Sequence, residues 1–288
     1  MTGLALVLVL AAAFMHATWN LLAKRASGGG AFLWMVCVAA AVIYAPLAAA
    51  VVILQQPHLG PAQAAFMAGS AALHLGYFLM LTRGYRVGDL SLIYPLARGT
   101  GPALSTLAAV AFFGERPTWV AVLGAALVVG GVVVLTRGPR GVRRSEAAAL
   151  RATAYGLLTG VLIATYTLWD KRAVSVLLVP PLLLDWAANV GRLLFLTPVA
   201  IRHWDEVRHH WRAHRLETVG VGVLAPLAYI LVLTALVFTP VSYIAPAREV
   251  SILIGTAMGT RLLAEGDSIR RLGAAAAIVA GVVALAVG

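Results

Sequence analysis

Two arginines and one glutamate lie inside apolar stretches of this 288-residue sequence, where they could bind an anion and carry a proton. Arg98 lies in "YPLARGTGP" (94–102), and Arg248 and Glu249 lie in "IAPAREV" (244–250). A guanidinium presents a fork of donors that matches a carboxylate or a phosphate. We predict that Arg98 and Arg248 bind an anionic group of a substrate. The alternative for Arg248 is a structural ion pair with Glu249 or another acid.

Glu249 is the one carboxylate that the sequence places well inside an apolar helix, so we predict that it carries a coupling proton. Asp185, Asn189 and Arg192 form a separate stripe at i, i+4 and i+7. Residues at this spacing share one face of a helix. We expect that stripe to be structural.

Polar and aromatic residues in other apolar stretches extend the candidate set. His16, Trp19 and Asn20 share a helix face, and aromatic rings with one polar end suit an amphipathic ligand. The alternative is that the polar groups bond to neighbouring helices, as is common in membranes. The predicted substrate-binding residues besides the arginines are His16, Trp19, Asn20, His74, Tyr77, Tyr94, Tyr166 and Tyr229.

These residues need a membrane fold to position them. The chain is 61% hydrophobic and 11% charged, with a mean hydropathy of +0.91, whereas ordinary soluble domains are roughly 25% charged. A helix needs roughly 17–25 apolar residues to cross a bilayer. We predict an all-α integral membrane protein with ten transmembrane helices, at 3–22, 31–54, 62–82, 90–113, 117–136, 152–170, 178–201, 217–237, 241–263 and 269–287.

Cysteine usage and charge exclude several classes of protein. The single cysteine, Cys37, allows no intramolecular disulfide and no CxxC metal motif, so we expect no metal and no cofactor. The net charge is +11, but the basic residues lie in short caps between apolar stretches. This pattern favours anionic lipid head groups over nucleic acid as partners. We expect the two densest clusters, at 137–151 and 202–215, to be solvated loops, with Trp204 and Trp211 as interfacial anchors.

The sequence contains an internal repeat. "TWNLLAKRA" (18–26) resembles "TYTLWDKRA" (165–173), which aligns Trp19 with Tyr166, and Arg98 aligns with Arg248 at an offset of 150 residues. We divide the chain into a first repeat (1–138), a basic linker (139–151) and a second repeat (152–288). Five helices per repeat is an odd number, so the repeats are antiparallel. Antiparallel repeats bring their equivalent arginines together near the bilayer midplane, where substrate sites of such carriers lie.

The first helix, ending in "HATWNLLAKRA", and "FFGERPTWVAVLGAALVVGGVVVL" (112–135) resemble the EamA family of the drug/metabolite transporter superfamily. The second half carries a weaker echo, "LLAEGDSIRRLGAAAAIVAGVV" (262–283). The resemblance implies a carrier of small molecules, often an exporter, with a central cavity lined by the first, third, fourth, sixth, eighth and ninth helices. It also implies cytoplasmic termini, whereas the positive-inside rule applied to the loops places both termini outside.

We therefore predict a multi-pass secondary transporter of the inner (cytoplasmic) membrane that works by alternating access. Its substrate is a small anionic or zwitterionic solute such as an amino acid, organic acid or phosphonate. The expected partners are this solute and membrane lipids, with no nucleic acid, and the protein is a monomer or homodimer. The alternatives are a lipid flippase or a membrane-embedded lipid-modifying enzyme. The enzyme is disfavoured because the sequence has no HExxH, GxSxG or Walker A motif.

Overall fold

The computed structural model describes residues 1–26, 29–87, 90–136, 146–254 and 268–288. All regular secondary structure in these ranges is helical. The helices are α1 (Gly3–Arg25), α2 (Gly30–Gln55), α3 (Pro61–Val87), α4 (Leu90–Phe113), α5 (Trp119–Thr136), α6 (Glu146–Ser175), α7 (Pro181–Arg202), α8 (Trp204–Phe238), α9 (Val241–Ala247) and α11 (Ser268–Val287).

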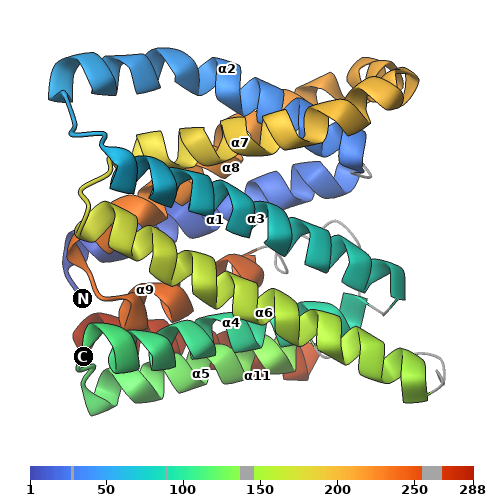
Figure 1. Cartoon of the computed structure of the whole chain (residues 1–288). Coiled ribbons are helices and arrows are strands. Elements are labelled where there is room, and N and C mark those ends of the chain that lie inside the picture. The colour runs from blue at the N-terminus through green and yellow to red at the C-terminus, as the bar shows by residue number, and fades with distance from the viewer. Residues whose placement is uncertain (27–28, 88–89, 137–145, 255–267) are drawn as a thin grey trace.

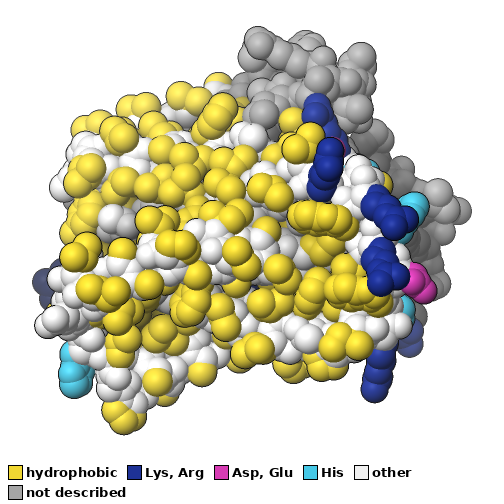
Figure 2. All heavy atoms as spheres, turned by 90° about the horizontal axis from the view of Figure 1, so that it is seen from above, with side chains coloured by type: hydrophobic (Ala, Val, Ile, Leu, Met, Phe, Trp, Pro, Cys, Tyr) yellow, Lys and Arg dark blue, Asp and Glu magenta, His cyan; other side chains and the backbone are white. Residues whose placement is uncertain are grey.

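The helices are apolar enough to cross a membrane. Among the described residues, six helices meet the length and hydropathy that a span requires: Gly3–Ala23, Gly30–Gln55, Pro61–Leu81, Leu150–Ser175, Pro181–Arg202 and Trp204–Phe238. Figure 2 shows apolar side chains over most of one face, with Lys and Arg gathered along one edge. Such an apolar surface with a charged edge is typical of a multi-pass membrane protein.

Helices from the two ends of the chain pack against each other. α1 packs on α8, α3 on α6 and α7, α2 on α7 and α8, and α5 on α11, while α4 contacts α6 and α9. Both termini lie at the same end of the bundle (Figure 1). The first and second halves are therefore interleaved, and any site in the centre draws residues from both.

Close packing of α5 on α11 depends on glycine. A Cβ atom on Gly124 would lie 2.7 Å from the Gly281 carbonyl oxygen, and one on Gly281 would lie 2.6 Å from the Gly124 oxygen. No larger residue fits at either position without moving the helices apart. Small residues at such crossings allow the close backbone approach that membrane helices use for packing.

The turn between α8 and α9 is held by Glu115, from the turn between α4 and α5, and by Lys171 of α6. The Glu115 carboxylate accepts hydrogen bonds from the backbone N–H groups of Val241 (2.8 Å) and Ser242 (2.9 Å) at the start of α9. The Lys171 ammonium donates to the carbonyls of Leu236 (2.6 Å) and Thr239 (3.0 Å) at the end of α8. Both pairs satisfy backbone groups that a helix end leaves without partners.

The expectation of a solvated loop over 202–215 is wrong, because α8 begins at Trp204. The backbone at His214 is not helical (φ −134°, ψ 33°), so residues 204–213 form a separate short helix before the transmembrane part of α8. We call residues 204–213 the interfacial segment. It is helical because its bulky side chains recur at helical spacing and pack against α2.

Candidate functional site

Arg98 of α4 and Arg248, just after α9, converge on the carboxylate of Glu249. Arg98 Nη1 lies 3.4 Å from Glu249 Oε1, and Arg248 Nε lies 3.5 Å from the same oxygen. The Glu249 side chain is 1% exposed and both arginine side chains are 11% exposed. The other carboxylate oxygen, Oε2, has no hydrogen-bond partner among the described residues. The group therefore holds two positive charges and one negative charge away from water.

The helix is interrupted where Arg248 and Glu249 lie. α9 ends at Ala247, and residues 250–254 are helical again. The Glu249 N–H bonds to the Pro246 carbonyl (3.0 Å), and the Ser251 N–H bonds to the Arg248 carbonyl (3.2 Å), which are i to i−3 bonds of a tighter turn. Pro246 has no N–H to continue the α-helical pattern. Discontinuous helices of this kind line substrate sites in many transporters.

Each arginine has a second contact on another helix. Arg98 Nη2 lies 3.0 Å from His16 Nε2 on α1, and Arg248 Nη2 donates to the Tyr166 hydroxyl on α6 at 3.3 Å. Trp19 Nε1 lies 3.2 Å from the other ring nitrogen of His16, Nδ1. A neutral imidazole has only one acceptor nitrogen, so His16 can accept from Arg98 or from Trp19 but not from both. Only one of these two donors can therefore bond to the His16 ring at a time.

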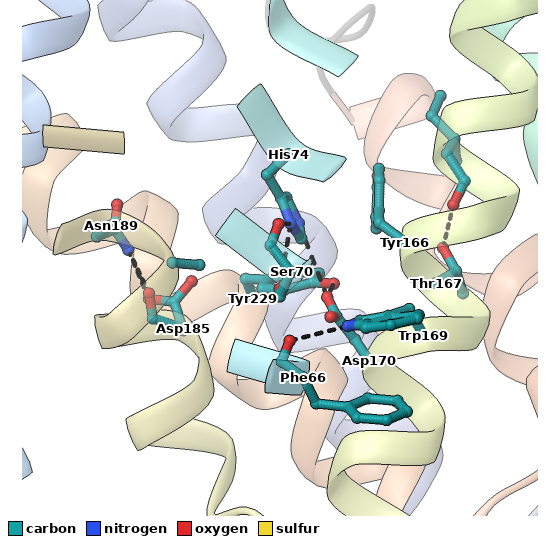
Figure 3. A network of polar contacts seen from close by, with 12 residues as sticks. Phe66, Ser70, His74, Tyr166, Thr167, Trp169, Asp170, Asp185, Asn189 and Tyr229 are labelled. Atoms are coloured by element: carbon teal, nitrogen blue, oxygen red, sulfur yellow. Dashed lines mark hydrogen bonds and ion pairs between the residues drawn. The ribbon is translucent and has the colours of Figure 1, made fainter. Parts of the chain in front are cut away.

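A second polar cluster surrounds Asp170 of α6 (Figure 3). Tyr229 of α8 donates its hydroxyl to Asp170 Oδ2 at 2.5 Å, and His74 Nε2 of α3 lies 3.9 Å from the same oxygen. His74 Nδ1 lies 2.9 Å from the Ser70 carbonyl, which can only accept, so Nδ1 carries the proton. The Asp170 side chain is 0% exposed, and its Oδ1 has no hydrogen-bond partner among the residues described.

Tyr166 connects the two clusters. Its hydroxyl accepts from Arg248, and its ring stacks on the His74 ring with centroids 4.3 Å apart. Tyr77 and Tyr229 contact the Tyr166 ring edge to face, at 5.8 and 6.4 Å. Tyr166 therefore contacts Arg248 of the first cluster and His74 and Tyr229 of the second.

The structure brings most of the predicted site residues together, but the Asn20 side chain lies outside the cluster. Asn20 is exposed, and its amide donates to the His16 carbonyl of its own helix at 2.7 Å. The Tyr94 side chain lies outside the described part of the structure. Trp19 is half-buried and reaches the cluster only through His16.

Comparison with known proteins identifies the first half of the chain. The family model of the EamA-like transporter family matches residues 3–137. These residues belong to the EamA family of the drug/metabolite transporter superfamily. The EamA half, as we call residues 3–137, contributes Arg98, His16 and His74 to the clusters. Arg248, Glu249 and Asp170 lie in the other half.

The fold has a close counterpart among solved structures. One crystal structure matches 99% of this chain and 96% of its own, with a TM-score of 0.77 and 15% sequence identity. At this identity the match shows the fold of the whole chain. No curated protein matches the sequence.

Glu249 is not the only buried carboxylate among the described residues, because Asp170 and Asp185 are also buried. Asp170 lies four residues after Tyr166, so the two share a helix face that the sequence could have revealed. It was missed because Lys171 and Arg172 follow it and suggested the end of a span. α6 instead continues to Ser175.

The stripe on α7 is connected within its own helix. The Asn189 amide donates to Asp185 Oδ2 at 2.9 Å, and Arg192 Nη2 donates to Asn189 Oδ1 at 2.9 Å. No group of three or more His, Cys, Asp or Glu side chains within the described ranges is placed to hold a metal ion.

Proposed function

We propose that this protein is a secondary transporter of small anionic or zwitterionic solutes, not an enzyme, and that Arg98 and Arg248 bind the anionic group. The observation that carries the proposal is the convergence of both buried arginines on a single carboxylate. The proposed architecture is ten transmembrane helices in two antiparallel five-helix repeats, in the inner (cytoplasmic) membrane. Alternating access then moves one repeat against the other around the site.

The packing of α5 on α11 supports the repeat. A Cβ on Gly131 would lie 2.7 Å from Ile278, and a Cβ on Gly281 would lie 2.7 Å from Val128. Gly131 and Gly281 are 150 positions apart, and so are Val128 and Ile278, so each pair occupies equivalent positions of the proposed repeats. A two-fold axis between the repeats would turn the contact of Gly131 with Ile278 into a contact of Gly281 with Val128. Both contacts are present.

The arginine contacts support the same axis. Arg98 meets His16, and Arg248, 150 residues later, meets Tyr166, which is 150 residues after His16. This pairs Tyr166 with His16, whereas the sequence alignment paired it with Trp19. The axis would pass between the arginines, at the position of a substrate shared by both repeats.

The balance of charge supports an anion as the ligand. Arg98 and Arg248 share a single carboxylate, that of Glu249. A carboxylate, phosphate or phosphonate would bring a second negative charge to the two guanidiniums. A zwitterion would also place its cationic end toward Asp170, beyond the Tyr166 ring.

Glu249 would couple substrate to protons in this scheme. Its Oε1 lies beside both guanidiniums. An entering anion competes for the same guanidiniums, and protonation of Glu249 removes that competition. Proton and anion would therefore bind together.

Ligand-induced thermal stabilisation tests the proposal. Purified protein in detergent is melted with amino acids, organic acids, phosphonates and cationic drugs, since a ligand at 100 times its Kd stabilises by about 2.7 kcal/mol. We expect anions to raise the melting temperature of the wild type and of Arg192→Gln, a matched control that removes a membrane-embedded arginine elsewhere. The shift should vanish in Arg98→Gln and Arg248→Gln. Stabilisation by cations alone, or an anion shift that survives both substitutions, would overturn the proposal.

A further inference from the structure

A groove of about 930 Å³ lies between α2 and the interfacial segment, away from both polar clusters. Small-molecule sites occupy roughly 300–1,000 Å³, so the groove is large enough for a substantial ligand. Its lining is mostly apolar and consists of Trp34, Met35, Val38, Ala39, Val42, Ile43, Trp204, Val207, Arg208, Trp211, Arg212 and Val219. None of these residues takes part in the proposed transport site.

The interfacial segment turns one helix face toward this groove. Its five lining residues recur at i, i+3, i+4, i+7 and i+8, the spacing of neighbours along one face. Trp204 packs edge to face on Trp34 of α2, with centroids 5.9 Å apart. The break in the helix at His214 allows the segment to lie along α2 before the chain turns into the membrane. The groove is therefore built by the segment and does not result from loose packing.

Two cations at the groove have no partner among the residues that the structure describes. Arg208 and Arg212 are exposed and lie one helical turn apart. Neither forms a hydrogen bond or ion pair with another residue that the structure describes. A pair of guanidiniums with free donors is suited to the oxygens of a phosphate.

The lining of the groove combines the chemistries that a phospholipid needs. Val38, Val42 and Ile43 form an apolar strip along the transmembrane helix α2. Trp34, Trp204 and Trp211 add indoles, which favour the level of the head groups. Arg208 and Arg212 share the helix face of Trp204 and Trp211, so their charges lie beside these indoles.

We propose that this groove binds one membrane phospholipid with an anionic head group. Arg208 and Arg212 hold the phosphate, and an acyl chain lies on the strip formed by Val38, Val42 and Ile43. The lipid bridges α2 and α8, so its binding stabilises the packing of these helices. The proposal is independent of the transported solute.

The experiment compares two charge-matched double variants in detergent micelles, with phosphatidylglycerol or phosphatidylcholine added. Arg208→Gln/Arg212→Gln removes the groove cations. Arg202→Gln/Arg215→Gln removes two exposed cations that flank the groove without lining it. Native mass spectrometry counts bound lipids, and thermal melting measures stabilisation.

We expect phosphatidylglycerol to bind one per chain and to raise the melting temperature of the wild type and of the flanking variant. The groove variant should bind phosphatidylglycerol roughly 10- to 100-fold more weakly. Each arginine facing an anionic lipid strengthens binding, and the loss of two such arginines corresponds to this change in affinity. Val38→Trp, which fills the strip but keeps the charges, should also lose the bound lipid while still eluting as a folded protein.

Three outcomes would overturn the proposal. Equal weakening in both double variants would show only a general attraction of the basic surface for anionic lipid. Equal binding of phosphatidylcholine would remove the role of charge. Association of two chains through this face, abolished by Val38→Trp, would make the groove a protein interface.

Discussion

Glu249→Gln should destabilise the protein more than the loss of either arginine. The two Arg–Glu contacts, at 3.4 and 3.5 Å, each correspond to about 5 kcal/mol of attraction at an effective dielectric constant of about 20. Without Glu249 the site holds two uncompensated charges, whereas Arg98→Gln or Arg248→Gln leaves one arginine paired with one carboxylate. Removing one partner of a buried pair costs about 3–5 kcal/mol. We expect Glu249→Gln to lower the free energy of unfolding by about 5 kcal/mol or more. We expect each arginine variant to lower it by less than Glu249→Gln does.

Thermal melting of purified protein, followed by tryptophan fluorescence or by loss of the monodisperse peak on heating, measures this order. Asp205→Asn is the control, because it removes an exposed carboxylate from the interfacial segment and should leave the melting temperature unchanged. The double variant Arg98→Gln/Glu249→Gln should recover part of the loss, since it restores the original net charge of the site. The reasoning would be refuted if Glu249→Gln melted at or above the temperature of Arg98→Gln.

Two further substitutions test the packing and the second polar cluster. Gly281→Ala should lower the melting temperature, because its Cβ would lie 2.6 Å from a carbonyl oxygen of the facing helix, whereas Gly130→Ala meets nothing within 4 Å and should be neutral or stabilising. Equal effects at the two glycines would contradict this. Tyr229→Phe should cost about 1–3 kcal/mol, because it removes the hydroxyl that donates to the buried Asp170 carboxylate. Tyr155→Phe is its control, and matching losses on melting would show that the hydroxyl bond contributes nothing specific.

Sequence reasoning predicted the parts of this fold that depend on composition. The apolar runs located most of the helices, because only a helix satisfies its own backbone in lipid, although α8 begins at Trp204 and not at the predicted residue 217. Arg98 and Arg248 were expected to lie close together, and the structure places both beside Glu249. These predictions needed no knowledge of which helix faces which.

The errors arose where charge and spacing have more than one structural meaning. A basic stretch such as 202–215 can be a loop or an interfacial helix. Only the helical spacing of Trp204, Val207 and Trp211 distinguishes the helix from the loop. Asn20 shares the helix spacing of His16, but spacing shows that residues are neighbours without showing which edge faces the core. Asp170 was hidden by the cations that follow it, although α6 extends beyond them.

The ion pair between Arg98 and Glu249 joins residues that are 151 positions apart. A ribosome adds roughly 5–20 residues per second, so Arg98 is in place roughly 8–30 seconds before its counter-charge is synthesised. During that interval the EamA half lacks Glu249, the carboxylate that pairs with Arg98 in the complete chain. A chain truncated before Glu249 cannot form this ion pair, so we expect it to be less stable than the complete protein.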